Sequence, residues 1–90
     1  MGFEWDEKKS QKTHEERGVT FGQATSLWAD PDSLEVEANV QGESRSLKIG
    51  KLSDGKIYTA VFTMRAPNIR IISFRRSRPN EEAKYEQSKD

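Results

Sequence analysis

The feature that most constrains this chain is a pair of apolar segments joined by a short turn. Residues 56–64 and 69–74 are rich in branched and aromatic side chains, and only "RAPN" separates them. Such segments favour β-strands, and so short a connection makes them antiparallel neighbours in one sheet. Because only 32% of the 90 residues are hydrophobic, the core must be small. We expect a single domain over residues 1–90, with its last few residues disordered.

Two further segments extend this sheet. Residues 45–50 alternate between polar and apolar side chains, and the turn "SDG" at 53–55 connects them to the strand over 56–64. Residues 34–37 form a weaker, acidic strand. Because consecutive strands joined by short turns form a meander, the sequence predicts a small antiparallel sheet of three to four strands.

Two helices are predicted ahead of these strands in the chain. Asp6 is a favourable N-cap for a polar helix that runs to about Arg17 and stops at Gly18. Thr20 and Gln23 have the spacing of a capping box at the start of a second helix, which ends before the next proline.

Short segments at the two ends of the chain complete the fold prediction. Phe3 to Trp5 form a short extended candidate with aromatic side chains on one side, and Pro79 is placed to begin a short C-terminal helix. The predicted fold class is therefore α+β. Two N-terminal helices pack on a small antiparallel sheet, a short helix follows it, and the other face of the sheet stays partly open.

Charge is distributed unevenly along a chain whose formal net charge is zero. Residues 30–45 hold five acids and one arginine, whereas residues 65–80 hold five arginines and no acid. A local field comes from such clusters and not from the total, so neutrality does not exclude an anionic partner. It does argue against sequence-independent coating of nucleic acid, which usually requires a basic domain.

The arginines are expected at the two ends of the sheet. In an antiparallel meander the start of one strand lies beside the end of its neighbour, which brings Arg45, Arg65 and Arg70 to one edge. Arg75 and Arg76 lie at the other end of the last strand, and strict alternation puts Arg70 and Arg75 on opposite faces. Guanidinium groups suit phosphate because they donate paired hydrogen bonds and stay charged. The simpler alternative is that these arginines are merely solvated.

Other reactive chemistry is sparse. The chain has no cysteine, and its one histidine, His14, lies on the polar helix, where a solvated role is commoner than a catalytic one. The carboxylates lack metal-ligand spacing and no glycine-rich phosphate loop is present, so we expect neither metal nor cofactor. No apolar run approaches the roughly 20 residues that cross a bilayer, and no signal peptide is visible. We therefore expect a cytoplasmic protein without a membrane partner.

Seven short stretches of the sequence match a known family in the right order. They are "FEWDEKK" (3–9), "GVTFGQA" (18–24), "ADP" (29–31), "GESR" (42–45), "KIG" (48–50), "IRIISFRRS" (69–77) and "EEAKYE" (81–86). Each is short, but together they span nearly the whole chain. On these stretches the chain resembles the BrnT family, the toxin half of a bacterial toxin–antitoxin pair of type II.

The resemblance implies a fold similar to RelE-type ribonucleases and a metal-independent endoribonuclease activity that inhibits translation. It also implies neutralisation by a cognate BrnA-like antitoxin, a DNA-binding protein through which alone the toxin would reach operator DNA. The residues predicted for catalysis on RNA are Arg45, Arg65, Arg75 and Glu43, with His14 as another candidate base. Those predicted to bind RNA or the antitoxin are Arg17, Arg70 and Arg76.

Two positions depart from the usual pattern of the family. Arg17 and Asn39 stand where its members commonly carry histidine, and His14 lies nearly one helical turn from Arg17. The leading hypothesis is an RNA-cleaving toxin that relies on its arginines. The alternative is a catalytically degenerate module that binds an antitoxin without cleaving RNA. A third interpretation is an orphan domain whose arginines only increase solubility.

Overall fold

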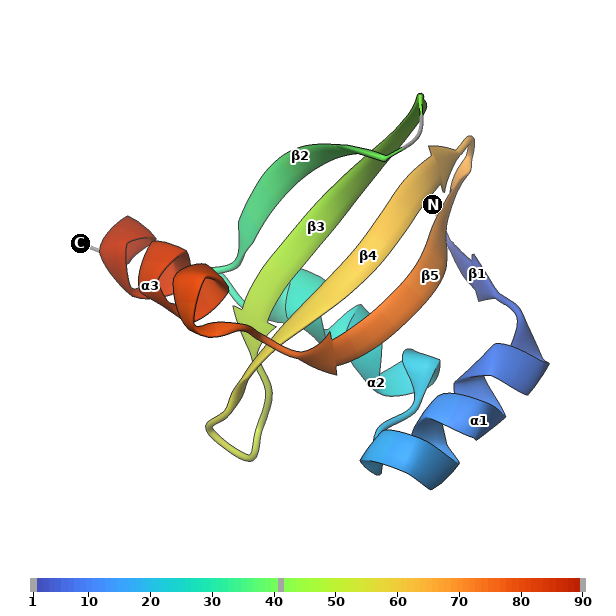
Figure 1. Ribbon diagram of the computed structural model, residues 1–90, viewed down its shortest axis with the longest axis horizontal. Coiled ribbons are helices and arrows are strands. Elements are labelled where there is room, and N and C mark those ends of the chain that lie inside the picture. The colour runs from blue at the N-terminus through green and yellow to red at the C-terminus, as the bar shows by residue number, and fades with distance from the viewer. Residues whose placement is uncertain (1, 41, 90) are drawn as a thin grey trace.

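The computed structural model describes residues 2–40 and 42–89 of the chain. Within these ranges the chain forms one mixed sheet of five strands, in the order β1-β5-β4-β3-β2, with helices on both faces (Figure 1). The elements are β1 (Phe3–Trp5), α1 (Glu7–Arg17), α2 (Phe21–Ala24), the 3-10 helix η1 (Thr25–Ala29), β2 (Leu34–Val40), β3 (Glu43–Lys51), β4 (Ile57–Arg65), β5 (Asn68–Arg76) and α3 (Pro79–Ser88). The predicted α+β class is confirmed.

The predicted number of strands is too low, because β1 joins the sheet. It pairs in parallel with β5, with Phe3 opposite Ile69 and Trp5 opposite Ile71, and the Ile69 amide donates to the Gly2 carbonyl over 2.9 Å. This pairing covers the outer edge of β5, whose backbone groups would otherwise lack partners. A strand of three residues that pairs with the far end of the chain has too little local pattern for the sequence to predict its partner.

The first two helices begin at their predicted caps. Asp6 accepts hydrogen bonds from two backbone amides at the start of α1, and Gly18 ends that helix in the left-handed conformation with a φ of 76°. Thr20 and Gln23 form the predicted capping box of α2. The second helix is less regular than predicted, because after one α-helical turn it continues as η1 up to Ala29.

One face of the sheet is covered by α2 and η1. Phe21 and Leu27 of these helices pack against Phe62, Ile71 and Phe74 of the strands, and all five side chains are at most 2% exposed. Burying a large apolar side chain contributes roughly 1.5–3 kcal/mol. This cluster is the main core, and it holds the N-terminal helices on the sheet.

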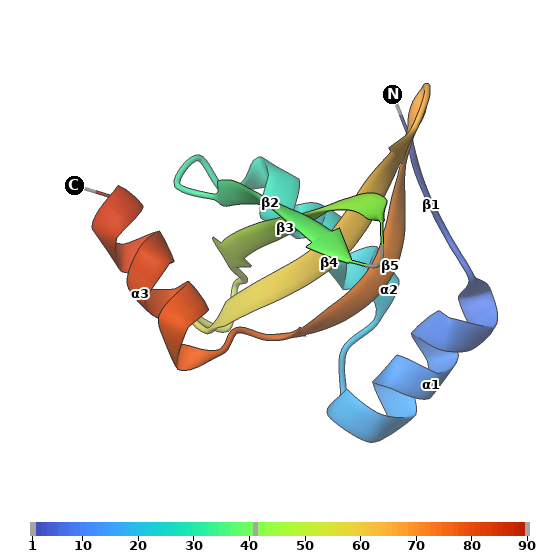
Figure 2. The same ribbon diagram turned by 45° about the horizontal axis from the view of Figure 1, so that its top comes forward.

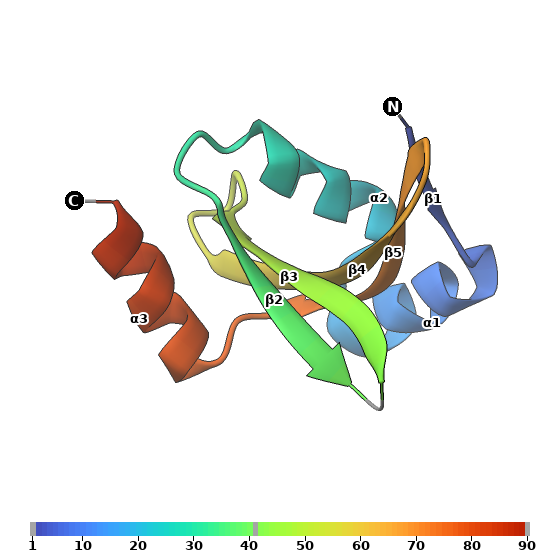
Figure 3. The same ribbon diagram turned by 90° about the horizontal axis from the view of Figure 1, so that it is seen from above.

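The opposite face is covered at one end, by α3. Tyr85 of α3 packs against Ile49 and Ile57 in a second, smaller cluster, so the helices lie on both faces and not on one as predicted. Figure 2 shows α3 and α1 flanking the sheet, and Figure 3 shows α3 and α2 on its opposite sides. The strands between α1 and α3 stay partly exposed, as predicted for one face. We call this region the open face; it carries Arg45, Leu47, Val61, Thr63, Arg70 and Ser73.

A β-bulge in β5 decides which of its arginines reach the open face. Ile71 and Ser73 pair with consecutive residues of β4, so Ile72 between them has no partner there. One extra residue shifts the alternation of the side chains that follow it. Arg70 and Arg75 therefore point to the same face, and the prediction that they lie on opposite faces is wrong.

Candidate functional site

Three arginines from different strands line one hollow at the edge of the open face. Arg45 comes from β3, Arg65 from β4 and Arg70 from β5, and the hollow has a volume of about 570 Å³. Lys9 of α1 adds a fourth cation to its lining. The predicted convergence of the three guanidinium groups at one edge is confirmed. We call this site the arginine hollow, with Arg45, Arg65, Arg70 and Lys9 as its cations.

Glu4 of β1 lies beside two of these arginines. Its Oε1 atom is 3.8 Å from Nε of Arg65 and 3.9 Å from Nη1 of Arg70, and it has no hydrogen-bond partner among the residues that the structure describes. Both distances exceed that of a hydrogen bond. The Oε1 atom itself is buried, whereas the Arg65 side chain is 65% exposed. The ion pairs are therefore long, and the guanidinium groups retain donors for another anion.

Arg75 is held in a quite different way at the other end of β5. Its Nη1 and Nη2 atoms donate to the two carboxylate oxygens of Glu81 over 2.7 and 2.9 Å. Glu81 also accepts from Thr59 Oγ1 and from the backbone amide of Arg78, and it is only 4% exposed. The Arg75 guanidinium, aided by these donors, lowers the pKa of Glu81 to about 2. This buried pair fixes the start of α3 to the sheet.

Arg17, Arg75 and Arg76 line a second hollow at this end of β5. Arg17 Nη1 donates to the Phe74 carbonyl over 3.0 Å, and the Arg76 guanidinium lies 5.7 Å from the centre of the Tyr58 ring. This hollow has a volume of about 410 Å³, and its remaining lining includes Val19. It combines an apolar wall with a rim of guanidinium groups, a combination that suits an aromatic anion or a nucleobase.

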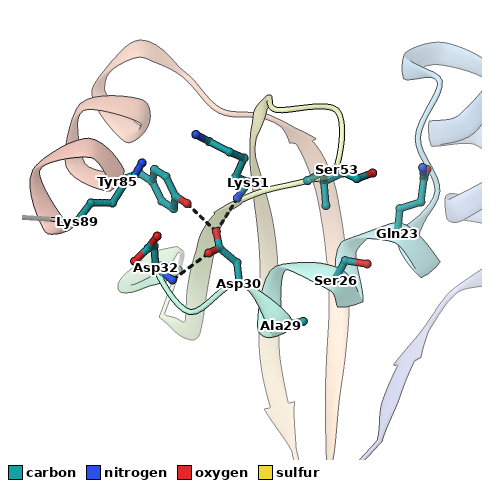
Figure 4. Close-up of a pocket in the computed structure, with 10 residues that line it drawn as sticks. Gln23, Ser26, Ala29, Asp30, Asp32, Lys51, Ser53, Tyr85 and Lys89 are labelled. Atoms are coloured by element: carbon teal, nitrogen blue, oxygen red, sulfur yellow. Dashed lines mark hydrogen bonds between the residues drawn. The ribbon is translucent and has the colours of Figure 1, made fainter.

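Asp30 forms a third polar site, at the junction of η1, β3 and α3 (Figure 4). Its Oδ2 atom accepts from the Tyr85 hydroxyl over 2.7 Å and from the Lys51 amide over 2.9 Å, and Oδ1 accepts from the Asp32 amide. Partial burial would raise the pKa of Asp30, but these three hydrogen bonds hold it below its usual value. Burial and the contact with Asp30 raise the pKa of Tyr85. Because Tyr85 belongs to α3, its hydrogen bond to Asp30 anchors that helix.

Neither a metal site nor a membrane span is found in the described part of the chain. No three or more histidine, aspartate or glutamate side chains are grouped so that they could hold a metal ion there. None of the helices in residues 2–40 and 42–89 is long and apolar enough to cross a membrane.

The family comparison gives this geometry a biological context. Residues 5–81 match the profile of the family described as "Ribonuclease toxin, BrnT, of type II toxin-antitoxin system". The chain belongs to the BrnT family. Its family is thus one of ribonuclease toxins, and type II pairs contain a protein antitoxin. No curated protein sequence matches the chain significantly.

A solved BrnT structure has the same fold. The crystal structure of the Brucella abortus ribonuclease toxin BrnT matches with a TM-score of 0.65, over 87% of this chain and 97% of that one. The two sequences are 20% identical. At that identity the likeness concerns the fold, so the roles of individual residues must come from the chain's own geometry.

The BrnT-family chain places its predicted site residues in several groups. Arg45, Arg65 and Arg70 come together, whereas Arg75, Arg17 and Arg76 lie toward the other end of β5. The side chains of Glu43 and Asn39 lie outside the described part of the structure. His14 is exposed on α1 and lines none of these hollows.

Sequence reasoning missed Lys9, which lines the arginine hollow, and Glu4, which pairs with two of its arginines. Glu4 reaches Arg70 because the two residues lie opposite each other in the β1–β5 pairing, and Lys9 reaches the hollow because α1 runs along the sheet edge. The basic content of α1 was visible in the sequence. Nothing local, however, could show which strand β1 would join.

Proposed function

We propose that this chain is the toxin of a type II pair and cleaves RNA without a metal ion, which slows translation. The observation that carries the proposal is the convergence of Arg45, Arg65 and Arg70 on one accessible hollow beside a carboxylate. We place its action in the cytoplasm, where its RNA substrate would be. The kinship of the fold to RelE-type ribonucleases stays a prediction.

The arginine hollow supplies the cations that metal-free RNA cleavage needs around the phosphate. In this reaction the 2′-oxygen attacks the neighbouring phosphorus, a base takes the 2′-hydroxyl proton, and the 5′-oxygen leaves with a proton from an acid. Arg65 and Arg70 donate to the non-bridging phosphate oxygens, whose negative charge grows as the bond forms. Arg45 provides a third donor from the neighbouring strand.

Glu4 is the described carboxylate that pairs with Arg65 and Arg70, and we propose it as the base. Asp6 lines the hollow, but its side chain is engaged as the N-cap of α1. The Oε1 atom of Glu4 is buried against the two arginines that would hold the phosphate, while the side chain as a whole is 33% exposed. The proton of a 2′-hydroxyl beside that phosphate would pass to the exposed part of this carboxylate. Glu43 stays the alternative base, because the next two residues along β3, Ser44 and Arg45, line the hollow. Exchanging each for glutamine, singly, distinguishes them.

Arg75 has a positioning role in this proposal and does not contact RNA phosphate in the arginine hollow. Both of its terminal nitrogens are engaged by the buried carboxylate of Glu81. We propose that a cognate antitoxin of the BrnA-like, DNA-binding kind places acidic side chains over the arginine hollow. The toxin then meets operator DNA only through that antitoxin.

The test is RNA cleavage by the purified chain in the presence of a metal chelator. We expect the double variant Arg65→Ala/Arg70→Ala to cleave at least about 100-fold more slowly, because removing even one preorganised donor to the reacting oxyanion has this scale of effect. Lys84→Ala, which removes an exposed cation from α3, is the matched control and keeps its activity. In cells, expression of the wild type slows growth, and the double variant does not.

The absence of histidine at two positions where the family commonly carries it favours a second candidate function. Arg17 and Asn39 stand where the family commonly has histidine, so the chain could retain the partner and lack the chemistry. In that case the wild type leaves RNA intact at every concentration, binds its antitoxin, and loses this binding when Arg65 and Arg70 are removed. That result would contradict the catalytic proposal.

A further inference from the structure

The arginine hollow continues into two more hollows along α1 and β5. The neighbouring hollow lies between α1 and β5 and shares Lys9, Arg45 and Ile72 with the arginine hollow. It shares Arg17 with the hollow at Arg76. The three hollows are thus consecutive, and they run from one end of β5 to the other. We call this surface the basic track.

Most of the charged residues that line the basic track are cations. Among its lining residues are eight cations and two acids, on a chain whose formal net charge is zero. The acids are Asp6 and Glu16. The cations are Lys9, Lys12, Arg17, Arg45, Arg65, Arg70, Arg75 and Arg76. Such a surface concentrates the field of the molecule along one line.

The polar character of α1 fits a ligand on its sheet side. A helix normally presents an apolar stripe to the core, but Ser10 is the one buried residue of α1. The residues of α1 that line the track lie at 9, 12, 13, 16 and 17, which is one face of a helix. Two polar contacts attach the helix: Ser10 Oγ accepts from the Phe21 amide, and Arg17 donates to the Phe74 carbonyl.

We propose that the basic track binds a single strand of RNA and extends the substrate site several nucleotides beyond the arginine hollow. The proposal rests on the proposed function, because it takes the arginine hollow as the point where the backbone is cut. Phosphates lie along the cations, and bases contact the apolar parts of the wall. The hollow between Val19 and Tyr58, rimmed by Arg17 and Arg76, receives the terminal base.

The length of the track sets the length of the strand. Arg70 and Arg76 are six residues apart on β5, which corresponds to about 20 Å at roughly 3.3 Å per residue. A stacked strand at about 3.4 Å per nucleotide covers this distance with about six nucleotides, and a more extended strand needs fewer. Shorter RNA cannot reach both ends, so affinity should rise with length and then stop rising.

The alternating chemistry of the track favours RNA over an acidic protein segment. An acidic segment needs cations alone, whereas this surface places an apolar hollow of about 410 Å³ within a ring of guanidinium groups. Guanidinium planes and aromatic side chains stack on unpaired bases, and a duplex would not present its bases to such a wall.

The test measures binding of 2′-O-methyl oligonucleotides, which lack the 2′-hydroxyl nucleophile and stay intact. Fluorescence anisotropy is recorded with full-length chain and oligonucleotides of two to ten nucleotides. We expect affinity to rise up to about six nucleotides and then level off. Lys12→Ala/Arg17→Ala should weaken binding of the six-nucleotide strand about 10-fold and leave that of the dinucleotide unchanged. The slope of log K against log salt should fall by roughly 0.7 for each cation removed.

Lys8→Ala is the matched control for Lys12→Ala alone, because each removes one charge from the same helix and Lys8 lines none of the three hollows. It should bind the six-nucleotide strand as the wild type does. Equal losses in Lys8→Ala and Lys12→Ala would show a general charge effect and overturn the track. Unchanged RNA binding in the double variant, or weakened binding of the antitoxin alone, would overturn it as well.

Failure of the track and failure of the proposed function give different results. If Arg65→Ala/Arg70→Ala abolishes cleavage while Lys12→Ala/Arg17→Ala binds the six-nucleotide strand normally, the track is wrong and the proposed function stands. If the wild type cleaves no RNA but binds this strand through Lys12 and Arg17, the track stands and the proposed function is wrong.

Discussion

The two ends of β5 use arginine in opposite ways. At the end beside β1, Arg70 lies 3.9 Å from a carboxylate oxygen of Glu4, and this oxygen has no hydrogen-bond partner among the described residues. At the end beside α3, Arg75 makes two hydrogen bonds of 2.7 and 2.9 Å to the buried carboxylate of Glu81. The residue types are the same, so geometry and burial separate an ion pair that supports the fold from one that can exchange its anion.

The two ion pairs differ because removing one partner costs a different amount of free energy in each. Glu81 has exchanged water for four hydrogen-bond donors, and removing one partner leaves a buried charge uncompensated. The Oε1 atom of Glu4 is buried, but Arg65 is 65% exposed and 3.8 Å away, and an ion pair with so exposed a partner contributes about 0–1 kcal/mol. In the proposed function a phosphate would therefore compete with Glu4 for Arg65 and Arg70, neither of which is hydrogen-bonded to it.

The largest effect is expected from a substitution that breaks the Arg75–Glu81 pair. Glu81→Ala should lower the free energy of unfolding by about 3–5 kcal/mol, because Arg75 stays behind in a partly buried site without its carboxylate. Glu4→Ala, the matched change at the loose end, should lower it by no more than about 1 kcal/mol. Urea denaturation followed by circular dichroism measures both. Equal losses in the two variants would erase the distinction between the two ends.

The second-largest effect is expected from acid, which should weaken the Arg75–Glu81 pair. The pKa of Glu81 is about 2 in the folded chain, against an ordinary value of 4.5, so the folded state holds this proton less firmly than the unfolded state. The resulting stability, about 3 kcal/mol, is present above pH 4.5 and is lost as the pH falls toward 2. Unfolding free energies measured across this range should show the decline. In Glu81→Gln the decline should be smaller by that amount, and an unchanged pH profile would contradict the role of Glu81.

The smallest expected effect concerns the second anchor of α3. Tyr85→Phe removes a hydroxyl that donates to Asp30 over 2.7 Å from a ring that is 1% exposed, and should cost about 1–2 kcal/mol. Tyr58→Phe removes a hydrogen bond of the same length, but its acceptor, Asp54, is exposed in a turn. The melting temperature of the Tyr58→Phe variant should therefore fall less than that of the Tyr85→Phe variant. A larger loss at Tyr58 would mean that burial does not set the strength of these contacts.

Much of the fold could be predicted because its signals are local. The caps Asp6 and Thr20, the stop at Gly18 and the hairpin turns act within a few residues of where they stand, and the structure confirms them. The sheet edge at β1 could not be predicted in the same way. Its pairing with β5 joins the two ends of the chain, and three residues carry no pattern that selects a partner.

The candidate site likewise has a part that local connectivity predicts and a part that depends on pairing between distant segments. The sequence predicted that Arg45, Arg65 and Arg70 would meet, because antiparallel connectivity alone brings them together. It could not predict Glu4 beside them, which depends on the pairing of β1. It also placed Arg75 on the wrong face, because a bulge at Ile72 shifts the alternation and no residue type marks it.

The sequence by itself determined the order of helices and strands, the turns, and the supply of arginines at the two ends of the last hairpin. Tertiary structure alone decided which arginine is bound to a buried carboxylate and which faces solvent. The reason is that an ion pair depends on where its partner arrives and how much water remains, and both partners here come from distant segments. Glu4 and Glu81 are ordinary acids in the sequence, and only folding makes one a loose neighbour and the other an anchor.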